Sequence, residues 1–334
     1  KIAYPEDHFE QGNLPQILAS IAGNVFGMKA VESLRLEDIQ FTKKIVDSFP
    51  GPKFGKDGIR KFMKVSKRPV MLSVAKPKVG MTTEEHTEVG RQIWEGGLDL
   101  LKDDENLTNQ FFNPFEKRVK ACLKVRDRIE KETGEKKSYL INMTAATVKE
   151  MEKRAKIIKA NGGEFAMIDI MTTGWTGVAS MREICGDLGL ALHAHRAMHG
   201  AMTRNHYQGI SMNLVAKCAR LLGTDTLHIG TANIGKLVGS REEVLHIKDE
   251  ITLNKVKANS HEHTFEQEWF NIKPQFPCSS GGLHPALVEK VLNRMGTDIM
   301  LQIGGGVHAH PKGSYAGAKA MREAVDAYMQ GIPL

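Results

Sequence analysis

Hydrophobic residues fall into short runs that alternate with longer amphipathic stretches eight times from about residue 70 onward. Each run is apolar and is bounded by glycine, proline or charged residues, as expected for strands that are buried on both faces. The predicted strands are Val70–Ala75, Leu98–Lys102, Tyr139–Met143, Phe165–Met171, Leu190–His195, Thr226–Gly230, Phe276–Ser280 and Ile299–Ile303.

The stretches between these runs have the periodicity of helices that pack on a sheet. Met151, Ala155 and Ile158 share one face of such a stretch, whereas lysines occupy its other faces. The predicted helices are Glu84–Glu95, Phe115–Glu132, Val148–Ala160, Ser180–Leu188, Ser211–Leu222, Arg241–Glu250, Pro285–Arg294 and Tyr315–Met329.

Eight strand–helix units in strict alternation predict an α/β fold, a (β/α)₈ TIM barrel over residues 70–334. A doubly wound open sheet is the competing arrangement. Residues 1–69 have a different texture and are interpreted as a leading segment that packs on the barrel. This segment is predicted to contain an apolar helix near Ile17–Val25, a short strand near Leu34–Ile39 and a basic helix near Gly58–Lys67.

Composition narrows the class of protein. Hydrophobic residues make up 41% and charged residues 25% of the 334 residues, which allows a large core. The four cysteines are far apart and form no CxxC pair, which argues against a zinc or disulfide framework and indicates a reducing, cytoplasmic location. No apolar run reaches membrane-spanning length. The chain begins at Lys1, and both ends are expected to be truncations of a longer protein.

The net charge of +7 is spread along the chain among interleaved acidic residues, and no block is basic enough for a nucleic-acid arm. Basic charge gathered in a pocket would instead attract a small polyanion such as a sugar phosphate. The choice between these partners therefore depends on the candidate site.

Polar residues follow nearly every predicted strand, and in a barrel these strand ends meet on one face. After the second strand come Lys102, Asp104 and Glu105. The two carboxylates would suit Mg²⁺ if CO₂ converted the lysine into an anionic ligand. Taken alone, the tetrapeptide Lys102-Asp103-Asp104-Glu105 is better explained as a run of solvated charges that ends the strand. Lys76 and Lys78 follow the first strand. They could act as a proton donor and a phosphate clamp, or they could simply belong to a surface loop.

A cluster of histidines and an arginine follows the fifth strand. His195 and Arg196 belong to it, and His228 ends the next strand. Arg196 could clamp a phosphate with two hydrogen bonds. A transition-metal site is the alternative, although no carboxylate or cysteine lies at ligand spacing.

Glycines mark the last three strand ends. Residues 230–236 form a predicted loop that has glycines near both ends and carries the cation Lys236. It could be a mobile loop that carries Lys236 over the site, or an ordinary turn. The glycines after Ser280 and those at Gly304 and Gly305 would let backbone N–H groups approach a phosphate. Two such turns with Arg196 opposite suit a bisphosphate.

These motifs resemble the large subunit of ribulose-1,5-bisphosphate carboxylase/oxygenase (RuBisCO), in the family's order and through essentially the whole chain. The run ASIAGNVFGMKAVESLRLEDI is most similar to the archaeal type, form III or a related intermediate form. The motifs that carry the resemblance are GGLDLLKDDEN, AKPKVG, LHAHRAMH, GNVFG, SSGGLH and LQIGGG.

The resemblance implies a reaction: CO₂ adds to D-ribulose 1,5-bisphosphate through a Mg²⁺-bound enediolate to give two 3-phosphoglycerates, with O₂ as a competing substrate. It also implies that an activating CO₂ carbamylates Lys102, which holds Mg²⁺ with Asp104 and Glu105 and takes the C3 proton. Lys76 would protonate the final carbanion and Lys78 would support it.

The remaining roles follow from the same resemblance. His195 would transfer protons during hydration, Lys236 would stabilise incoming CO₂, and Asn24 would reach the metal-bound substrate. One phosphate site would contain Arg196, His228 and Ser280, and the other Gly282, Gly304 and Gly305. Partners would be copies of the same chain, as a homodimer or ring of dimers with sites between subunits and no required small subunit.

This sequence departs from the family pattern in three places. Most of the N-terminal α+β domain, which contributes to the neighbouring subunit's site, is expected to be missing. Val238 stands where the family commonly has an acidic residue, and Val307-His308-Ala309-His310 replaces the usual Thr-Leu-Gly-His. Two alternatives remain: a RuBisCO-like enolase or isomerase that does not carboxylate, and a basic binding or scaffold protein.

Overall fold

The centre of the molecule is a closed barrel of eight parallel strands, in the order β11-β12-β2-β3-β4-β5-β6-β8. A computed structural model describes residues 1–237 and 239–333. Every predicted barrel strand is present and the barrel is closed, so the alternative of an open, doubly wound sheet is wrong. The strands are β2 (Val70–Val74), β3 (Leu100–Lys102), β4 (Ser138–Asn142), β5 (Phe165–Asp169), β6 (Ala191–His195), β8 (Thr226–His228), β11 (Phe276–Ser280) and β12 (Met300–Ile303).

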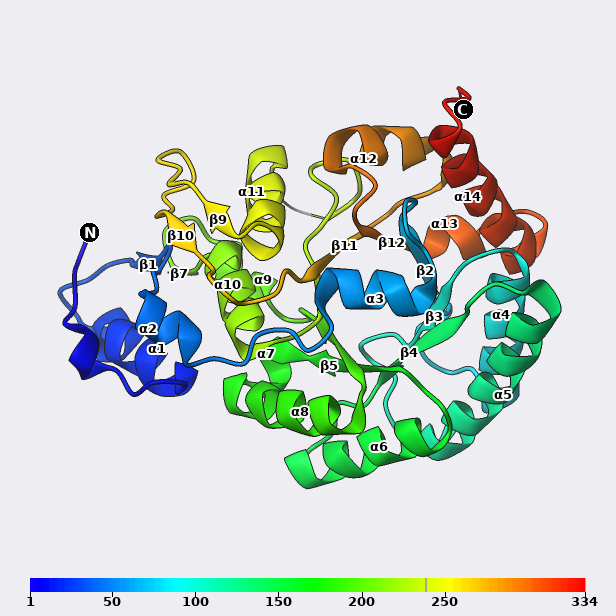
Figure 1. Ribbon diagram of the computed structural model, residues 1–334, viewed down its shortest axis with the longest axis horizontal. Coiled ribbons are helices and arrows are strands. Elements are labelled where there is room, and N and C mark those ends of the chain that lie inside the picture. The colour runs from blue at the N-terminus through cyan, green and yellow to red at the C-terminus, as the bar shows by residue number, and fades with distance from the viewer. Residues whose placement is uncertain (238, 334) are drawn as a thin grey trace.

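Helices surround this barrel (Figure 1). The long ones are α4 (Thr83–Glu95), α5 (Phe115–Thr133), α6 (Val148–Ala160), α8 (Trp175–Leu188), α10 (Met212–Leu222), α11 (Arg241–Thr252), α12 (Val288–Met295) and α14 (Gly313–Met329). Hydroxyl side chains cap the N-termini of several of these helices. At α4 the Thr82 hydroxyl accepts from Glu85 N, and Thr147, Ser211 and Ser240 cap α6, α10 and α11 in the same way. Three single turns follow strand ends: α7 (Ile170–Thr173), α9 (Gly200–Thr203) and α13 (Gly305–His308).

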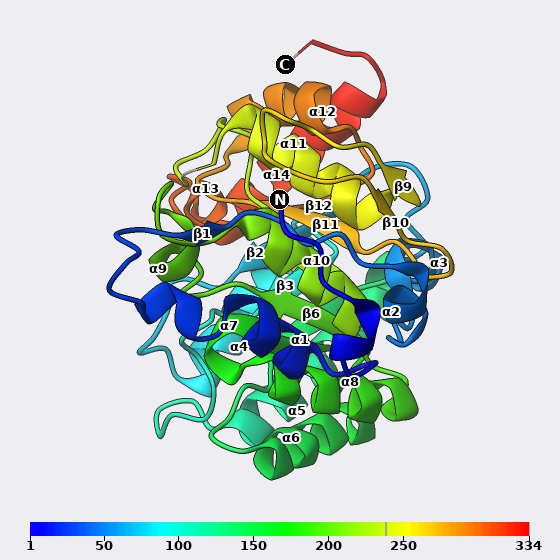
Figure 2. The ribbon, with the colours of Figure 1, turned by 90° about the vertical axis from the view of Figure 1, so that its left-hand side faces the viewer.

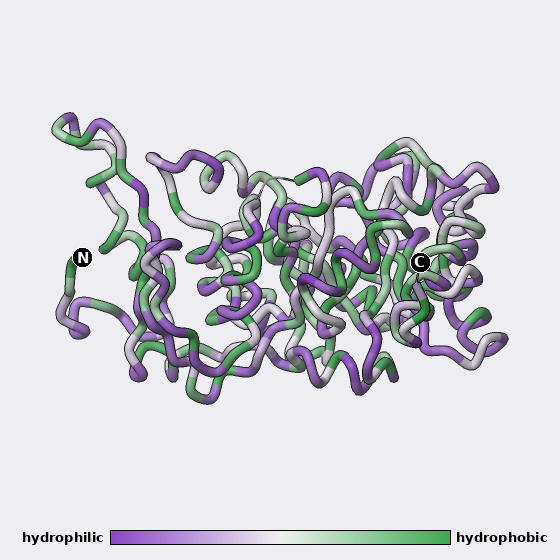
Figure 3. The backbone as a smooth tube through the Cα atoms, turned by 90° about the horizontal axis from the view of Figure 1, so that it is seen from above, coloured by the Kyte–Doolittle hydropathy of each residue, from purple (hydrophilic) through white to green (hydrophobic). Residues whose placement is uncertain are grey.

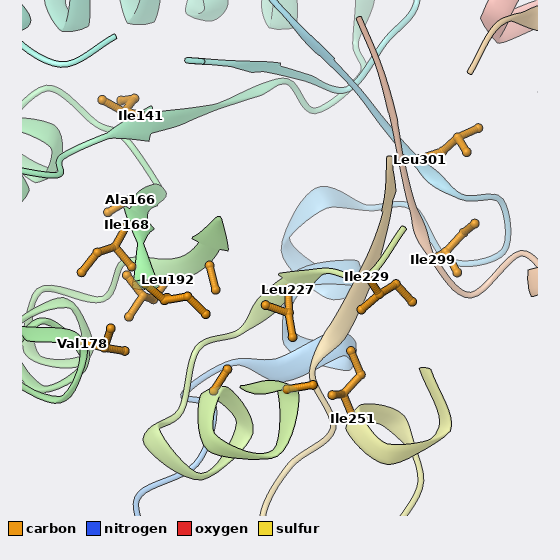
Figure 4. Close-up of a cluster of buried hydrophobic side chains, with 14 of the residues drawn as sticks. Ile141, Ala166, Ile168, Val178, Leu192, Leu227, Ile229, Ile251, Ile299 and Leu301 are labelled. Atoms are coloured by element: carbon orange, nitrogen blue, oxygen red, sulfur yellow. The ribbon is translucent and has the colours of Figure 1, made fainter. Parts of the chain in front are cut away.

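Alternate residues of each strand face two different cores. Leu72 and Leu100 pack inside the barrel with Phe165 and Phe276, whereas Ile141 and Leu192 belong to the larger layer between the barrel and its helices. Figure 4 shows this second layer, with strand residues such as Leu192 beside Val178 of α8. Hydrophobic stretches accordingly run through the interior in Figure 3. Burial on both faces explains why the strands read as continuous apolar runs.

Residues 1–47 of the leading segment lie at one end of the long axis, and the C-terminal end of the chain lies near the other (Figure 1). Figure 2 views the molecule from the end that holds residues 1–47, whereas residues 55–63 lie over the centre of the barrel in Figure 1. The elements of the leading segment are α1 (Leu14–Ala22), β1 (Arg35–Leu36), α2 (Lys43–Asp47) and α3 (Gly55–Met63). β1 pairs in parallel with β7 (Gly209–Ile210), so the predicted strand is present but only two residues long. β9 (Lys255–Val256) and β10 (Gln267–Glu268) form a second small sheet.

Helix α3 begins and ends earlier than predicted. Its last residue is Met63, because Lys64 adopts a left-handed conformation with φ of 57°. Ile59 and Met63 belong to the same buried cluster as the interior of the barrel, so α3 closes one end of it. Helix α1 likewise begins at Leu14, where the Asn13 side chain accepts from Gln16 N. In the described part of the chain, no helix is long and apolar enough to cross a membrane.

Candidate active site

Lys102 ends β3 in the interior of the barrel mouth and is only 1% exposed. Its Nζ donates to the main-chain oxygen of Asp103 at 2.8 Å. Burial lowers the pKa of Lys102, although the carboxylates of Asp104, Glu105 and Asp169 oppose that shift. A buried lysine with a lowered pKa is more often a neutral amine, the form that reacts with CO₂.

The two predicted metal ligands lie beside two lysines from the end of β2. Lys76 pairs with Asp104, and Lys78 Nζ lies 2.6 Å from Glu105 Oε1. Burial raises the pKa of Asp104, and its contact with Glu105 adds to the shift. Burial alone would also raise the pKa of Glu105, but hydrogen bonds with Asp104 and Lys78 outweigh it and lower that pKa. The structure therefore brings Lys76, Lys78, Asp104 and Glu105 together.

His195, at the end of β6, completes this group. Its Nε2 lies 3.8 Å from Glu105 Oε2, and its Nδ1 lies 3.0 Å from Asp169 Oδ1. Burial lowers the pKa of His195, with Lys102 acting in the same direction, whereas Asp169 raises it. Asp169 ends β5 and was not singled out in the sequence, although its place at a strand end is the signal that could have identified it.

Asn142 is a second residue that sequence reasoning missed. It ends β4, is fully buried, and its Nδ2 donates to the main-chain oxygens of Asp104 at 3.3 Å and Glu105 at 3.1 Å. These two bonds fix the backbone that presents both carboxylates. Again, the place at the end of a strand was the available signal.

A second cluster lies across β6, β8 and β11. His228 Nδ1 lies 2.9 Å from Ser280 Oγ, and His228 Nε2 lies 2.9 Å from His193 Nε2. Arg196 is 7% exposed, and its guanidinium forms no hydrogen bond or ion pair with any other residue that the structure describes. Burial lowers its pKa to about 10, so the guanidinium stays charged at neutral pH. A buried cation without a carboxylate partner suits an anionic ligand.

The glycine turns lie at the ends of β11 and β12. A Cβ on Gly304 would lie 3.5 Å from Lys76 Cε, so the Lys76 side chain passes directly over this turn. Gly305 is open, with no neighbouring atom within 4 Å of where its Cβ would lie. Gly282 has φ of 72° and lies against Lys236, whose backbone N donates to Gly281 O at 3.0 Å. Lys236 is thus placed beside one of the two turns.

Of the positions that depart from the family pattern, the structure places His308 but does not describe Val238. His308 lies behind the end of β2, with its Nε2 3.0 Å from Val74 O and its Nδ1 2.9 Å from Ser314 Oγ. A carbonyl only accepts, so Nε2 carries the proton and the ring ties α13 to the strand that precedes Lys76. Val238 lies outside the described residues.

Asn24 is the one predicted site residue that lies apart from the others within this chain. It is exposed in the 3₁₀ helix Asn24–Gly27 of the leading segment. It lines a cavity of about 970 Å³ whose other walls come from residues 1–45, His263 and Phe265. None of the barrel-mouth residues lines that cavity.

The donor set at the barrel mouth fits a divalent cation better if Lys102 takes part. In the part of the chain that the structure describes, no three His, Cys, Asp or Glu side chains gather at metal-binding spacing. Asp104 and Glu105 supply two carboxylates, and Asp104 Oδ1 is buried without a hydrogen bond. A carbamate on Lys102 would add a third anionic oxygen ligand of the kind that magnesium prefers.

Comparison with known proteins agrees with this geometry. Residues 56–334 match the family described as "Ribulose bisphosphate carboxylase large chain, catalytic domain", and residues 1–45 match its N-terminal domain. The chain belongs to the RuBisCO large-chain family. The predicted family and its fold are therefore confirmed.

Individual relatives cover the whole chain. It is 50% identical to the ribulose bisphosphate carboxylase of Methanosarcina acetivorans and 51% identical to that of Methanocaldococcus jannaschii, in each case over 334 residues and 78% of the relative. Among solved structures, a dimeric archaeal RuBisCO from Hyperthermus butylicus is 46% identical, with a TM-score of 0.94 over 99% of this chain and 76% of that one. These relatives support the archaeal type and favour a carboxylase over the RuBisCO-like isomerase alternative.

Proposed function

We propose that this protein adds CO₂ to D-ribulose 1,5-bisphosphate and yields two molecules of 3-phosphoglycerate, with O₂ as a competing substrate. The observation that carries the proposal is the gathering of Lys76, Lys102, Asp104, Glu105 and His195 at one mouth of the barrel. Carboxylation and oxygenation of this kind need an acid, a base and a metal cation within reach of one sugar. These residues would supply the acid and the base and would hold the cation.

Lys102 as a carbamate, with Asp104 and Glu105, would hold Mg²⁺. The cation would supply Lewis-acid stabilisation of the negative charge that develops on the sugar oxygens. Lys76 and Lys78 now neutralise the two carboxylates. Both lysines would be free to contact substrate once Mg²⁺ took their place beside the carboxylates, which would make cofactor binding and substrate binding interdependent.

The chain's own groups account for the proton transfers. The Lys102 carbamate would remove the C3 proton to form the enediolate. Lys76 would protonate the carbanion that remains after C–C cleavage, because its ammonium group reaches Asp104 while its side chain crosses Gly304. His195, held between Asp169 and Glu105, would move a proton during hydration of the carboxylated intermediate.

The phosphates would occupy the two ends of the mouth. Arg196, His228 and Ser280 would bind one of them, and the backbone N–H groups of Gly282, Gly304 and Gly305 the other. Lys236 beside Gly282 would stabilise incoming CO₂. Support comes from the buried, unpaired Arg196 at one end and the open Gly305 at the other.

Asn24 would act in the site of a second copy of the chain. It is exposed and separated from the barrel mouth within its own chain. We therefore propose a homodimer or ring of dimers with sites between subunits, without a required small subunit. Solved relatives include a dimeric and an octameric archaeal RuBisCO.

Three finer assignments accompany this proposal. We divide the chain into a leading segment, 1–69, and a catalytic barrel, 70–334, since β2 begins at Val70. Among archaeal types we favour form III or an intermediate form. Four buried free cysteines support a cytoplasmic location.

A fixation assay tests the proposal. The protein, incubated with bicarbonate and Mg²⁺, is expected to incorporate ¹⁴CO₂ into acid-stable product only when ribulose bisphosphate is present. Replacement of Lys236 by methionine should abolish incorporation and preserve exchange of the C3 proton with solvent. Proton exchange without any ¹⁴C incorporation by the unmodified protein would instead identify an enolase or isomerase.

A further inference from the structure

The segment Thr231–Leu237, which follows β8 and carries Lys236, has an unusual backbone at its base. Ala232 and Asn233 are consecutive non-glycine residues in the left-handed region, with φ of 49° and 61°. A side chain disfavours this conformation, so it persists only where neighbouring groups hold it. Ala232 is fully buried, which leaves water unable to satisfy its backbone groups.

An arginine from another element supplies the missing interaction. Arg294, in the last turn of α12, donates from Nη1 to the main-chain oxygen of Ala232 at 2.6 Å. The bond is charge-assisted, and Arg294 forms no ion pair with the described residues that would compete with it. The cation is therefore committed to this one carbonyl.

The rest of the segment is packed tightly against the turn after β11. Gly235 N donates to Thr231 Oγ1 at 2.8 Å, and Lys236 N donates to Gly281 O at 3.0 Å. A Cβ at Gly235 would lie 1.7 Å from Gly281 O, so only glycine fits there. Because Gly235 approaches Gly281 so closely, the place of Lys236 beside Gly281 and Gly282 depends on the backbone conformation of the segment that precedes it.

We propose that Arg294 is a positioning residue that holds the backbone at Ala232 and thereby places Lys236 over the turn at Gly281 and Gly282. It touches none of the groups assigned to substrate or metal. Its effect on carboxylation rests on the proposed function, whereas its effect on the segment does not.

Hydrogen exchange tests the structural half. In R294M, which retains most of the side-chain packing, the amides of Gly235 and Lys236 should exchange about tenfold faster, the loss expected for one charge-assisted bond. R294K keeps a charged donor and should restore much of the protection. K290Q removes an exposed charge from the same helix and should exchange like the unmodified protein.

Two exchange results would overturn the proposal. One is unchanged exchange of Gly235 and Lys236 in R294M. The other is acceleration spread evenly over α12 and the barrel strands, which would mean that Arg294 only stabilises the fold. T231V provides a second variant, because it removes the acceptor of the Gly235 amide from within the segment and should reproduce the R294M pattern.

Kinetics test the link to Lys236. R294M should slow ¹⁴CO₂ incorporation about tenfold while exchange of the C3 proton and the KM for ribulose bisphosphate stay near those of K290Q. Equal loss of both reactions, or loss of neither, would contradict placement of Lys236 by Arg294. If the unmodified protein fixes no CO₂ and R294M still shows the local change in hydrogen exchange, the proposed function fails and the positioning of the segment stands.

Discussion

Lys78 Nζ lies 2.6 Å from Glu105 Oε1, so an ammonium group already occupies the place where a metal ion is expected to bind. Lys76 does the same for Asp104. The two carboxylates are therefore each paired with a lysine in this structure. Under the proposed function, carbamylation of Lys102 would add a third anionic neighbour and so favour Mg²⁺ at this place.

Replacing Lys102 by methionine tests this directly. Metal binding and CO₂-dependent activity should fall by about a hundredfold or more, since a ligand is lost. Stability should not fall, because an amine that is costly to bury gives way to an apolar side chain, and we expect a gain of about 1 kcal/mol. The measurements are Mn²⁺ binding with and without bicarbonate, and a thermal unfolding curve. Bicarbonate-dependent Mn²⁺ binding that survives in K102M would contradict the carbamate.

Arg196 makes a separate prediction about the phosphate site. R196M should weaken binding of ribulose bisphosphate by about 10- to 100-fold, the value of charge-assisted hydrogen bonds to a phosphate. Its unfolding temperature should be unchanged or higher, because a buried cation without a carboxylate partner is removed. Calorimetric titration with the bisphosphate measures the first effect, and inorganic phosphate serves as a weaker control ligand. Unchanged affinity would exclude Arg196 from the phosphate site.

Much of this arrangement was predictable because a barrel converts sequence order into spatial proximity. Buried strands such as Phe276–Ser280 are apolar throughout, and polar residues at their ends must meet at one mouth. That rule predicts that Lys78 and Glu105, and likewise His228 and Ser280, share one mouth, and the structure adds that they are in contact. The roles assigned to these residues came from the family resemblance and not from the pattern.

Other features left no periodic signal. The β1–β7 pair is two residues long and joins segments 174 residues apart, so no local pattern marks it. Asp169 and Asn142 are single polar residues at strand ends, and only their contacts with His195 and Glu105 distinguish them. Asn24 cannot be placed in a site from one chain if its substrate lies in another.

Asp103 supports the predicted metal ligands from the opposite side of β3. It is fully buried, accepts from the Tyr139 hydroxyl and from Asn142 N at 3.0 Å, and lies 3.3 Å from Arg118 Nη2. Burial alone would raise the pKa of Asp103, but Arg118 and the hydrogen bonds outweigh it and lower the pKa to about 2. This carboxylate therefore stabilises the fold above its unfolded pKa, and the contribution is lost as pH falls towards 2.

D103N should lower the free energy of unfolding at pH 7 by about 3 kcal/mol, because the Arg118 cation is left buried without its counter-ion. Urea denaturation measures the loss. The double variant D103N/R118M should lose less than the sum of its single variants, since the uncompensated charge is gone. Additive losses would show that Asp103 and Arg118 do not act as a pair.

Glu250, on α11, makes the protein's stability depend on pH far from the active site. It is fully buried, its Oε1 accepts from Trp269 Nε1 at 3.0 Å, and its Oε2 lies 3.8 Å from His246 Nε2. Burial raises the pKa of Glu250 to about 7, with Asp38 adding to the shift and Lys217 and Arg220 opposing it. The folded state thus keeps a proton that the unfolded chain has already lost.

The direction in which pH changes the stability follows from this difference in bound protons. Between about pH 4.5 and 7 the folded state binds one more proton at Glu250, so this residue lowers stability as pH rises, by about 3 kcal/mol in total. E250Q keeps an acceptor for Trp269 and removes this ionisation. Its stability relative to the unmodified protein should therefore increase from pH 5 to pH 8 in urea denaturation. A difference that stays constant with pH would mean that Glu250 does not titrate in this range.

His246 provides a control of opposite sign. Burial lowers its pKa, so the unfolded state binds the extra proton and this histidine raises stability as pH rises towards 6.5. H246Q should consequently make the fall in stability between pH 5 and 6.5 steeper, while E250Q makes it shallower. The two side chains are in contact, so the double variant should deviate from additivity most strongly in the same pH range.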